Sequence, residues 1–257
     1  MLSEKIELLG TGVYKDIPST LTVKSINTNT EIDKAGAEDF DKVMLDKILP
    51  AAVEEKINFR NLLEIDYEWL LRCLRFVNYG PYYTVNRVLC DECRTVSSTE
   101  QEVDLRTVNV NTLPEGFDNH IVISKDDFIE FDGDIEIHLL TIQERINSEN
   151  DKMFQAEGRK DSELARICYM ITKMKGKNVD PLSAKLTIEK MIDADYKILK
   201  AKIAESTNYG LTISGKCTCP NCKSNNANFV VFTDAKFFRP TLADLKAWKK
   251  SRSTSKD

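Results

Sequence analysis

Two Cys-x-x-Cys pairs are the residues of this 257-residue chain whose types and spacing indicate chemistry most directly. One pair is Cys90 and Cys93, and the other is Cys219 and Cys222. Each such turn places two thiolates side by side, and its backbone N–H groups can donate to the sulfurs. Two turns together supply the four tetrahedral ligands that zinc prefers. We therefore expect one structural Zn²⁺ site with four cysteine ligands, formed by pairs that lie 126 positions apart.

The seven cysteines of the chain leave other uses of these thiols open. The two pairs could instead be separate redox-active dithiols, or the site could be degenerate and hold no metal. Cys217 lies close to Cys219 and is a spare thiol that could replace one of the four ligands. Cys73 and Cys168 adjoin apolar residues on helical faces, which is typical of small buried thiols. In a reducing compartment, Cys-x-x-Cys spacing favours metal binding over disulfides.

Residues for catalysis are scarce in this sequence. A catalytic zinc keeps an open coordination position and commonly uses histidine, but the two histidines, His120 and His138, adjoin neither cysteine pair. The sequence contains no glycine-rich phosphate loop, nucleophile elbow or His-x-x-x-His helix. The acidic clusters at 126–127 and 132–134 lack the ligand alternation of a calcium loop. We therefore expect a non-enzymatic protein, with a metalloenzyme as the remaining catalytic alternative.

The composition is that of an ordinary soluble protein, with 42% apolar and 30% charged residues. The net charge of −5 disfavours nucleic acid and anionic membranes as partners of the whole molecule. The first residues lack the basic flank and apolar stretch of a signal peptide, and the apolar runs are too short to cross a bilayer, so we expect a cytosolic protein. Residues 243–257 alone are basic and polar, which predicts a flexible tail.

Two segments that each end in a cysteine pair share an order of features, which predicts an internal pseudo-repeat. In each segment an Asp-Tyr sequence opens a helix, an Asn-Tyr-Gly sequence closes it, a short strand follows, and the Cys-x-x-Cys turn comes next. The first segment has a helix at 66–77, capped by Asp66 and closed by Gly80, and a strand at 85–89. The second has a helix that starts at Asp195-Tyr196 and ends before Gly210, and a strand at 211–213.

The rest of the chain is expected to add an N-terminal strand and helix and a central region of strands and helices. Apolar alternation predicts a strand at 20–26, and helical spacing predicts a helix at 37–49 that Pro50 ends. Further strands are expected at 108–113, 120–123, 128–131 and 135–140. Further helices are expected from the capping box at Thr141, from Ser162 through Lys175, and from Asp180-Pro181.

These elements predict an α+β fold in which two helix-strand-knuckle halves are joined at one zinc-ribbon-like site of four cysteines. A small antiparallel β region and additional helices lie between the halves. The expected divisions are 1–60 for the N-terminal strand and helix, 61–115 for the first half, 116–190 for the central region, 191–242 for the second half, and 243–257 for the tail.

Several short runs resemble the T-even-type phage baseplate hub family over residues 21–240. They are 61–67 (Asn-Leu-Leu-Glu-Ile-Asp-Tyr), 70–75, Asn78-Tyr79-Gly80, both cysteine pairs, Tyr209-Gly210, the apolar run 229–232, and 237–240 (Phe-Phe-Arg-Pro). The resemblance implies a subunit of the baseplate hub or a factor in hub assembly, such as a chaperone of the tape-measure protein. Its partners would be tape-measure and hub proteins, and it would act in the virion tail baseplate or in the cytoplasm of the infected host. The family brings no catalytic residues.

The main alternative is a zinc-ribbon protein that binds nucleic acid, because ribbons of this kind commonly serve transcription and RNA machinery. Its phosphate contacts would come from the basic residues between Lys246 and Lys256. The acidic balance of the whole chain argues against this alternative.

Overall fold

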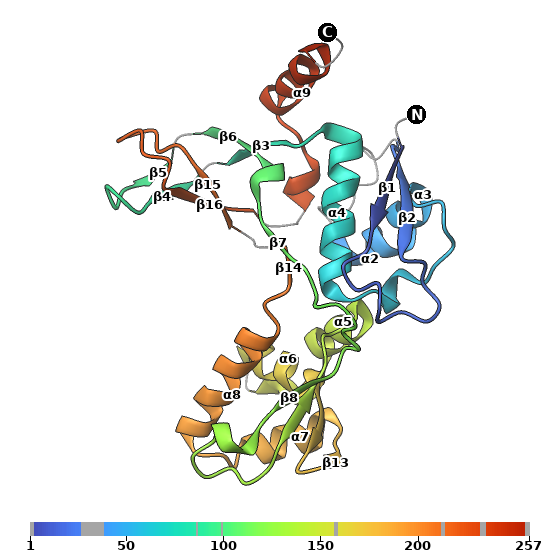
Figure 1. Ribbon diagram of the computed structural model, residues 1–257, viewed down its shortest axis with the longest axis vertical. Helices are drawn as coiled ribbons and strands as arrows, with labels where there is room; N and C mark the ends of the chain where they lie inside the picture. The colour runs from blue at the N-terminus through green and yellow to red at the C-terminus, as the bar shows by residue number, and fades with distance from the viewer. Residues whose placement is uncertain are drawn as a thin grey trace.

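The computed structural model of the chain describes residues 3–26, 39–85, 87–98, 100–156, 159–211, 214–231 and 235–254. The architecture is mixed α+β, as expected, with helices and several small antiparallel sheets. Figure 1 shows an upper and a lower part, and each part has its own core of buried apolar residues. We call the upper part, formed by residues 3–111 and 210–254, the body, and the lower part, formed by residues 119–206, the inserted module.

The body is built around α4 (Glu64–Tyr79), the longest helix in the described chain. Leu70, Leu74 and Val77 recur at helical spacing on its buried face, which confirms the helix that the sequence predicts at 66–77. Gly80 ends the helix with φ of +78°, a conformation that glycine adopts without strain. A Cβ at this position would also lie 2.4 Å from the ring of Trp248, so glycine is required for space as well.

The prediction that Asp66 caps α4 is wrong. The residue before the helix, Leu63, makes no side-chain capping bond, and Asp66 lies within the first turn. Its buried carboxylate instead accepts hydrogen bonds from the backbone N–H groups of Leu9 and Gly10 and from the Tyr14 hydroxyl. The aspartate therefore fixes the loop between the first two strands against α4, a tertiary role that helix periodicity does not reveal.

An N-terminal hairpin and a bent helical segment pack on α4. The hairpin consists of β1 (Ser3–Glu7) and β2 (Thr20–Lys24), which confirms the strand predicted at 20–26. The helical segment consists of α2 (Phe40–Val43), a π-helical turn (Met44–Ile48) and α3 (Leu49–Ala52).

The expected stop at Pro50 is wrong, because the helical segment continues to Ala52. Proline lies in the first turn of α3, where its missing N–H is not needed. The start predicted at residue 37 lies outside the described residues.

A four-stranded antiparallel sheet, which we call the ribbon, extends from the side of the body. Its strand order is β15-β16-β4-β5, so each of the two chain segments that form the body contributes one hairpin of two strands. The central pair is β16 with β4, and Ala227 lies opposite Cys90 in their register. The strands are β4 (Val88–Cys90), β5 (Val96–Ser97), β15 (Ser214–Cys217) and β16 (Ala227–Val230).

The chain enters and leaves the inserted module through two paired strands, β7 (Val110–Asn111) and β14 (Gly210–Leu211). The module itself has a sheet of order β13-β12-β9-β8 with helices packed on it. Its strands are β8 (Ile121–Ile123), β9 (Ile135–Ile137), β12 (Ile171–Met174) and β13 (Lys177–Asn178). Its helices are α5 (Ile142–Asn150), α6 (Ser162–Met170), α7 (Pro181–Ile188) and α8 (Asp193–Ser206), and of these α5 packs its apolar residues, Ile142 and Ile146, into the core of the body. A short hairpin joins β10 (Gln155–Ala156) and β11 (Arg159–Lys160).

Two elements of the module differ from the prediction. Residues 128–131 do not form a strand, because Asp195 accepts the backbone N–H groups of Ile129, Glu130 and Phe131 that a strand would share with a neighbour. The helix expected from Ser162 through Lys175 ends at Met170, where the chain turns into β12 and pairs with β9. The capping box at Thr141 is confirmed, since its side chain and that of Glu144 bond reciprocally to the backbone.

The two predicted halves share features but not strand partners. After α4 the chain forms β3 (Tyr82–Val85), which pairs with β6 (Gln101–Asp104), whereas after α8 it forms β14, which pairs with β7. The buried side chains of α8, Leu199 and Ile203, belong to the core of the module. Cys219 belongs to the core of the body, so the helix and the cysteine pair that were grouped in 191–242 contribute to different cores.

The prediction of a flexible tail at 243–257 is wrong as far as Thr254, because α9 (Leu242–Thr254) occupies this segment. Thr241 and Asp244 bond to each other's backbone N–H groups at the start of this helix. The carboxylate of Asp244 is buried and also accepts a hydrogen bond of 2.6 Å from Thr84 of β3. In the part of the chain that the structure describes, α9 and the other helices are all too short or too polar to cross a membrane.

Candidate metal centre

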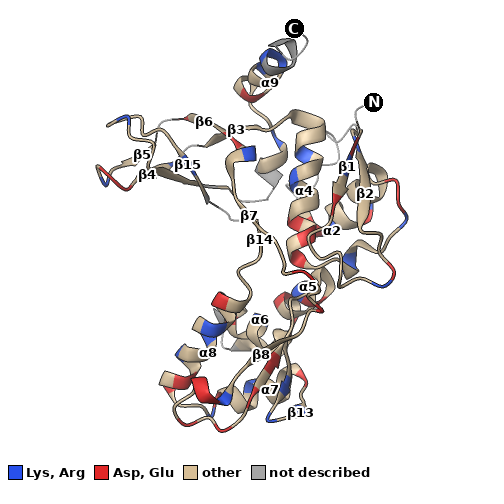
Figure 2. Cartoon of the chain, viewed as in Figure 1, with Lys and Arg blue, Asp and Glu red and all other residues tan. Residues whose placement is uncertain are grey.

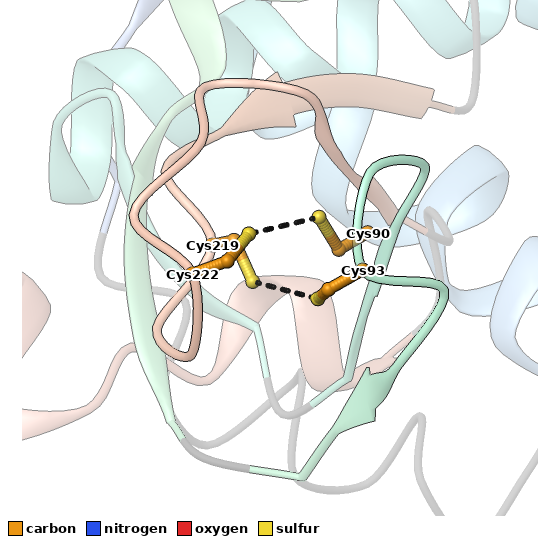
Figure 3. A group of neighbouring side chains, drawn as sticks. All are labelled: Cys90, Cys93, Cys219 and Cys222. Atoms are coloured by element: carbon orange, nitrogen blue, oxygen red, sulfur yellow. Dashed lines mark hydrogen bonds between the residues drawn. The ribbon is translucent and has the colours of Figure 1, made fainter.

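The four predicted cysteine ligands lie together where the two ribbon hairpins meet (Figure 3). Their sulfur atoms are all within 4.8 Å of one another, and the pairs Cys90–Cys222 and Cys93–Cys219 are 3.6 and 3.8 Å apart. Four sulfurs at the Zn–S bond length of about 2.3 Å would lie about 3.8 Å apart in a regular tetrahedron. The cluster therefore has the ligand type, number and spacing to coordinate one metal ion.

The two cysteine turns have the same local backbone geometry. Arg94 follows the first pair with φ of +53°, and Lys223 follows the second with φ of +64°. In each turn the first cysteine donates its N–H to a carbonyl five residues later, over 3.1 Å from Cys90 to Thr95. The second turn repeats this bond from Cys219 to the residue after Lys223. A left-handed non-glycine residue costs about 1 kcal/mol, and both turns accept that strain to aim two thiols at one point.

Hydrogen bonds and neighbouring sulfurs shift the pKa values of three of these thiols in different directions. The Thr95 hydroxyl and backbone N–H lower the pKa of Cys93 to about 6. The N–H of Cys222 itself holds the pKa of Cys219 below the ordinary thiol value. The Ser224 N–H also lowers the pKa of Cys222, but burial and the other three sulfurs outweigh it and raise that pKa to about 11. Four adjacent thiolates repel one another, and a cation between them would stabilise all four.

Side chains next to the cysteines tie the two turns to each other. Asn226 donates to Glu92 over 2.9 Å, and Asn228 donates to Asp91 over 2.8 Å. Asn221 of the second turn donates to Thr95, the residue that also contacts the sulfur of Cys93. These partners cannot be predicted from local sequence patterns, because asparagines of the second segment pair with residues of the first.

Burial divides the cluster into an inner and an outer side. Cys90 and Cys219 are buried, whereas Cys93 is half-buried and Cys222 is exposed. Val88, Ala227 and Phe229 form the apolar floor beneath the inner cysteines as part of the body's core. A site closed by four protein sulfurs, with one side on a packed core, has the form of a structural metal site.

The other three cysteines lie outside the four-sulfur group. Cys217 lies on β15 with its thiol 3.5 Å from the Gln101 side chain, and it is outside the four-sulfur group. Cys73 and Cys168 are buried in the body and the module, and burial raises the pKa of each thiol to about 12. These two thiols remain protonated at neutral pH.

The histidines and acidic clusters lie in the inserted module, away from the sulfurs. His120 bonds to Glu136 over 2.9 Å, and His138 bonds to Glu144 over 3.1 Å. In the acidic clusters, Asp127 forms an ion pair with a lysine of α8, and Asp134 accepts a backbone N–H. These groups thus have partners of their own within the module.

The buried guanidinium of Arg75, on the body side of the molecule, was not predicted from the sequence. Arg75 of α4 is fully buried, and its guanidinium donates to the carbonyls of Tyr82 and Phe237 and lies 3.7 Å from Asp244 of α9. The ring of Phe237 packs edge-on against Phe238 and lies 5.1 Å from the Arg75 guanidinium carbon. Phe237 and Phe238 are both buried in the core of the body. The sequence did contain a signal for this buried group, because Arg75 lies among the apolar residues that form the buried face of α4.

Comparisons with known proteins identified no relative of this chain. No protein-family model matches the chain, and searches of curated proteins and of solved structures found no match. What can be said of its function therefore depends on the residues and contacts described above. These establish a four-cysteine cluster that could hold one metal ion.

Proposed function

We propose that the cluster of Cys90, Cys93, Cys219 and Cys222 holds one Zn²⁺ ion and that its role is structural. The observation that carries this proposal is the spacing of the sulfurs, 3.6 and 3.8 Å across the two turns, which fits tetrahedral thiolate coordination. All four positions are taken by protein sulfur, so no position is left for a substrate or an activated water. The ion would clamp one hairpin from each of the two chain segments that form the body.

We also propose that the two segments ending in the cysteine pairs are related copies of one unit. Asp66 and Asp195 each occupy the third position of a helix, and each is buried and accepts backbone N–H groups of a distant loop. Gly80 and Gly210 follow those helices with φ of +78° and +87°. The shared turn at the two cysteine pairs adds a third correspondence. Different strand partners would then have arisen as one copy joined the inserted module.

The function we propose is that of a non-enzymatic phage tail protein, a baseplate hub component or a hub-assembly factor that binds other tail proteins. The supporting features are the resemblance of runs such as 61–67 and 237–240 to the T-even-type baseplate hub family, and a metal site without an open position. Both histidines hydrogen-bond to glutamates of the module, and neither lies beside the cysteines. The protein would act in the virion tail baseplate, in the cytoplasm of the infected host, or in both.

The proposed partners are tested by affinity purification of a tagged chain from phage-infected cells, followed by identification of the bound proteins. We expect tape-measure and hub proteins to be enriched over an untagged control. A variant lacking the clamp, Cys90→Ser, should lose them because the ribbon no longer closes. Recovery of no tail protein by the wild-type chain, under conditions where a known baseplate pair is recovered, would contradict the proposed function.

One observation favours a second candidate, a zinc-ribbon protein that binds nucleic acid. Helix α9 carries exposed basic residues, including Lys246 and Lys249, near the end of the chain. Binding to phosphates would be tight at low salt and would weaken steeply as salt rises, because counterions are released. Filter binding with DNA and RNA at two salt concentrations separates the candidates, since a tail-assembly protein should show no such affinity.

A further inference from the structure

A cluster of charged side chains joins the body to the inserted module where α2 and α4 meet α5 and α6, a place that we call the junction. The Arg166 guanidinium of α6 donates two hydrogen bonds, of 2.7 and 3.0 Å, to the carboxylate of Glu64 on α4. Arg145 of α5 donates to Asp41 of α2, and its Nε lies 3.8 Å from Glu64. Figure 2 shows acidic residues at the lower end of α4, next to α5. These ion pairs hold α5 and α6 against the body.

Glu68 lies one turn after Glu64 on α4 and is the carboxylate of this cluster that has no partner. It is partly buried, and it makes no hydrogen bond or ion pair with any residue that the structure describes. The charged groups that face it are Glu64 of its own helix, Asp41 of α2, Arg145 and Glu149 of α5, and Arg166 of α6. Four carboxylates, Glu68 included, thus share two guanidinium groups that are already bonded to the other acids. An ionised Glu68 is therefore excess negative charge in an interface that partly excludes water.

The packing beside this cluster is incomplete. A cavity of about 230 Å³ lies between the base of α4 and the module helices α6 and α8, and its wall includes Ile65, Ile167 and Ile203. Close packing resists small displacements, whereas a cavity leaves room for the helices on either side of it to shift. Helix α5 is held by the body, because Ile142 and Ile146 pack in the body's core. The elements with room to move relative to α4 are thus α6 and α8.

The surroundings of Glu68 make closure of the junction depend on pH. Burial and the neighbouring Glu64 raise the pKa of Glu68 to about 7, although the arginines act to lower it. In an opened junction the carboxyl group would return toward its ordinary pKa of 4.5. The closed junction therefore favours protonated Glu68. The stability that this adds is fully present below about pH 4.5 and is lost as pH rises through about 7.

We propose that Glu68 is a pH-sensitive switch that controls how tightly the inserted module closes on the body. When Glu68 is protonated, the charges at the junction are more nearly balanced and α6 lies against α4. When it is ionised, its repulsion with Glu64 and its lost hydration oppose that contact, and the cavity gives α6 and α8 room to shift. The ion pairs of Arg145 and Arg166 still hold the module at high pH, so the change is a loosening rather than a release.

Amide exchange in the purified full-length chain, measured by NMR, tests this switch. The amide of Glu64 donates to the carbonyl of Leu140 over 2.9 Å, and this bond crosses the junction. After correction for the intrinsic pH dependence of exchange, the opening constant at this amide should rise about tenfold between pH 6 and pH 8. Glu68→Gln keeps the shape but has no charge to gain, so its opening constant should stay at the low-pH value over this range.

Two further variants separate the switch from general effects of charge. Glu102→Gln removes a carboxylate of β6, outside the junction, and should leave the tenfold rise intact. Arg166→Gln removes positive charge that faces Glu68, so the rise should extend to higher pH.

Three outcomes would overturn the inference. They are an opening constant that does not change with pH in wild type, an equal rise in Glu68→Gln, and an equal rise at the amides of β9, which would indicate unfolding of the whole module. None of them bears on the metal centre or on the binding of tail proteins, so the switch and the proposed function can fail separately.

Discussion

The body and the inserted module solve the problem of forming a core in different ways. The module is one continuous segment, residues 119–206, whose sheet packs with α6, α7 and α8 into an apolar core. The body combines segments from both ends of the chain, 3–111 and 210–254, and its ribbon joins hairpins more than a hundred residues apart. Joining distant segments costs more chain entropy than joining near ones. The body is where the four cysteines and the Arg75–Asp244 pair lie.

The cysteine cluster and the Arg75–Asp244 ion pair therefore both lie in the body, where they join chain segments that are far apart in sequence. The cysteine cluster ties β4 to the second cysteine turn, and Arg75 ties α4 to α9 and to the carbonyl of Phe237. In the module, Asp195 holds a loop 64 to 66 residues earlier against α8, but both lie in the same continuous segment of the chain. The body should therefore depend on these ties far more than the module does.

Removal of the metal should produce the largest difference between the two regions. After treatment with a strong chelator, we expect amide exchange in β4 and β16 to accelerate about 100-fold or more, because the proposed ion closes the ribbon. Exchange in β9 and β12 of the module should remain slow. Hydrogen–deuterium exchange with mass spectrometry measures both in one sample, and equal acceleration in the two regions would refute the separate dependence.

Loss of the buried guanidinium should have the next largest effect. Arg75→Met leaves Asp244 buried without its cation, which typically costs about 3–5 kcal/mol. Both tryptophans, Trp69 and Trp248, lie in the body, so the urea midpoint of tryptophan fluorescence reports on this region. The matched control is Arg106→Gln, which breaks an exposed ion pair and should cost under about 1 kcal/mol. Similar shifts of the urea midpoint in both variants would show that the Arg75–Asp244 pair does not stabilise the body more than an exposed ion pair does.

Two glycines with positive φ provide a smaller comparison. An alanine at Gly80 would place Cβ 2.4 Å from the Trp248 ring, so Gly80→Ala should destabilise the body by about 2 kcal/mol or more. Gly176 of the module has φ of +71° but nothing within 4 Å of an added Cβ, so Gly176→Ala should cost about 1 kcal/mol. Urea unfolding followed by fluorescence and by circular dichroism measures each effect. A greater cost at Gly176 would contradict the packing of α9 on α4.

The pH dependence of Asp66 and Asp195 should give the smallest effect, with opposite signs. Burial raises the pKa of Asp66. Burial also acts to raise the pKa of Asp195, but hydrogen bonds from three backbone N–H groups hold it below the ordinary value. Stability from Asp195 is thus present above the unfolded pKa of about 4 and is lost as pH falls through the lower folded pKa. Ionised Asp66 opposes folding, so its protonation adds stability as pH falls from neutral toward about 4.

Unfolding of Asp66→Asn and Asp195→Asn, each compared with wild type between pH 7 and about pH 3, checks these signs. The deficit of Asp66→Asn should grow as the pH falls toward 4, and the deficit of Asp195→Asn should shrink below it. Parallel changes in the two deficits would mean that the two carboxylates have similar environments in the folded protein.

The features that could be predicted from sequence are those fixed within a few residues. The Cys-x-x-Cys turns, the capping box of Thr141 and Glu144, and the glycine after α4 each follow from local backbone requirements, and the structure has all of them. The cluster of four sulfurs was predicted because a structural zinc needs four ligands and each cysteine pair supplies only two. The two pairs must therefore lie together to bind one ion.

The features that could not be predicted depend on partners far along the chain. Asp66 has the sequence position of a cap, but its carboxylate binds a loop more than fifty residues earlier. Residues 128–131 alternate like a strand, yet Asp195 takes their N–H groups. Helix α9 was mistaken for a flexible tail because its stabilising contact, Asp244 with Arg75, joins two helices that no local pattern relates.

The central claim is that two distant cysteine pairs form one zinc site, and metal analysis of four purified proteins, the wild type and three single-cysteine variants, tests it most directly. Wild type should carry about one zinc per chain with four sulfur neighbours in X-ray absorption. Cys90→Ser and Cys219→Ser should each lose the metal, whereas Cys217→Ser should retain it. Equal zinc content in wild type and in both ligand variants would contradict a shared site.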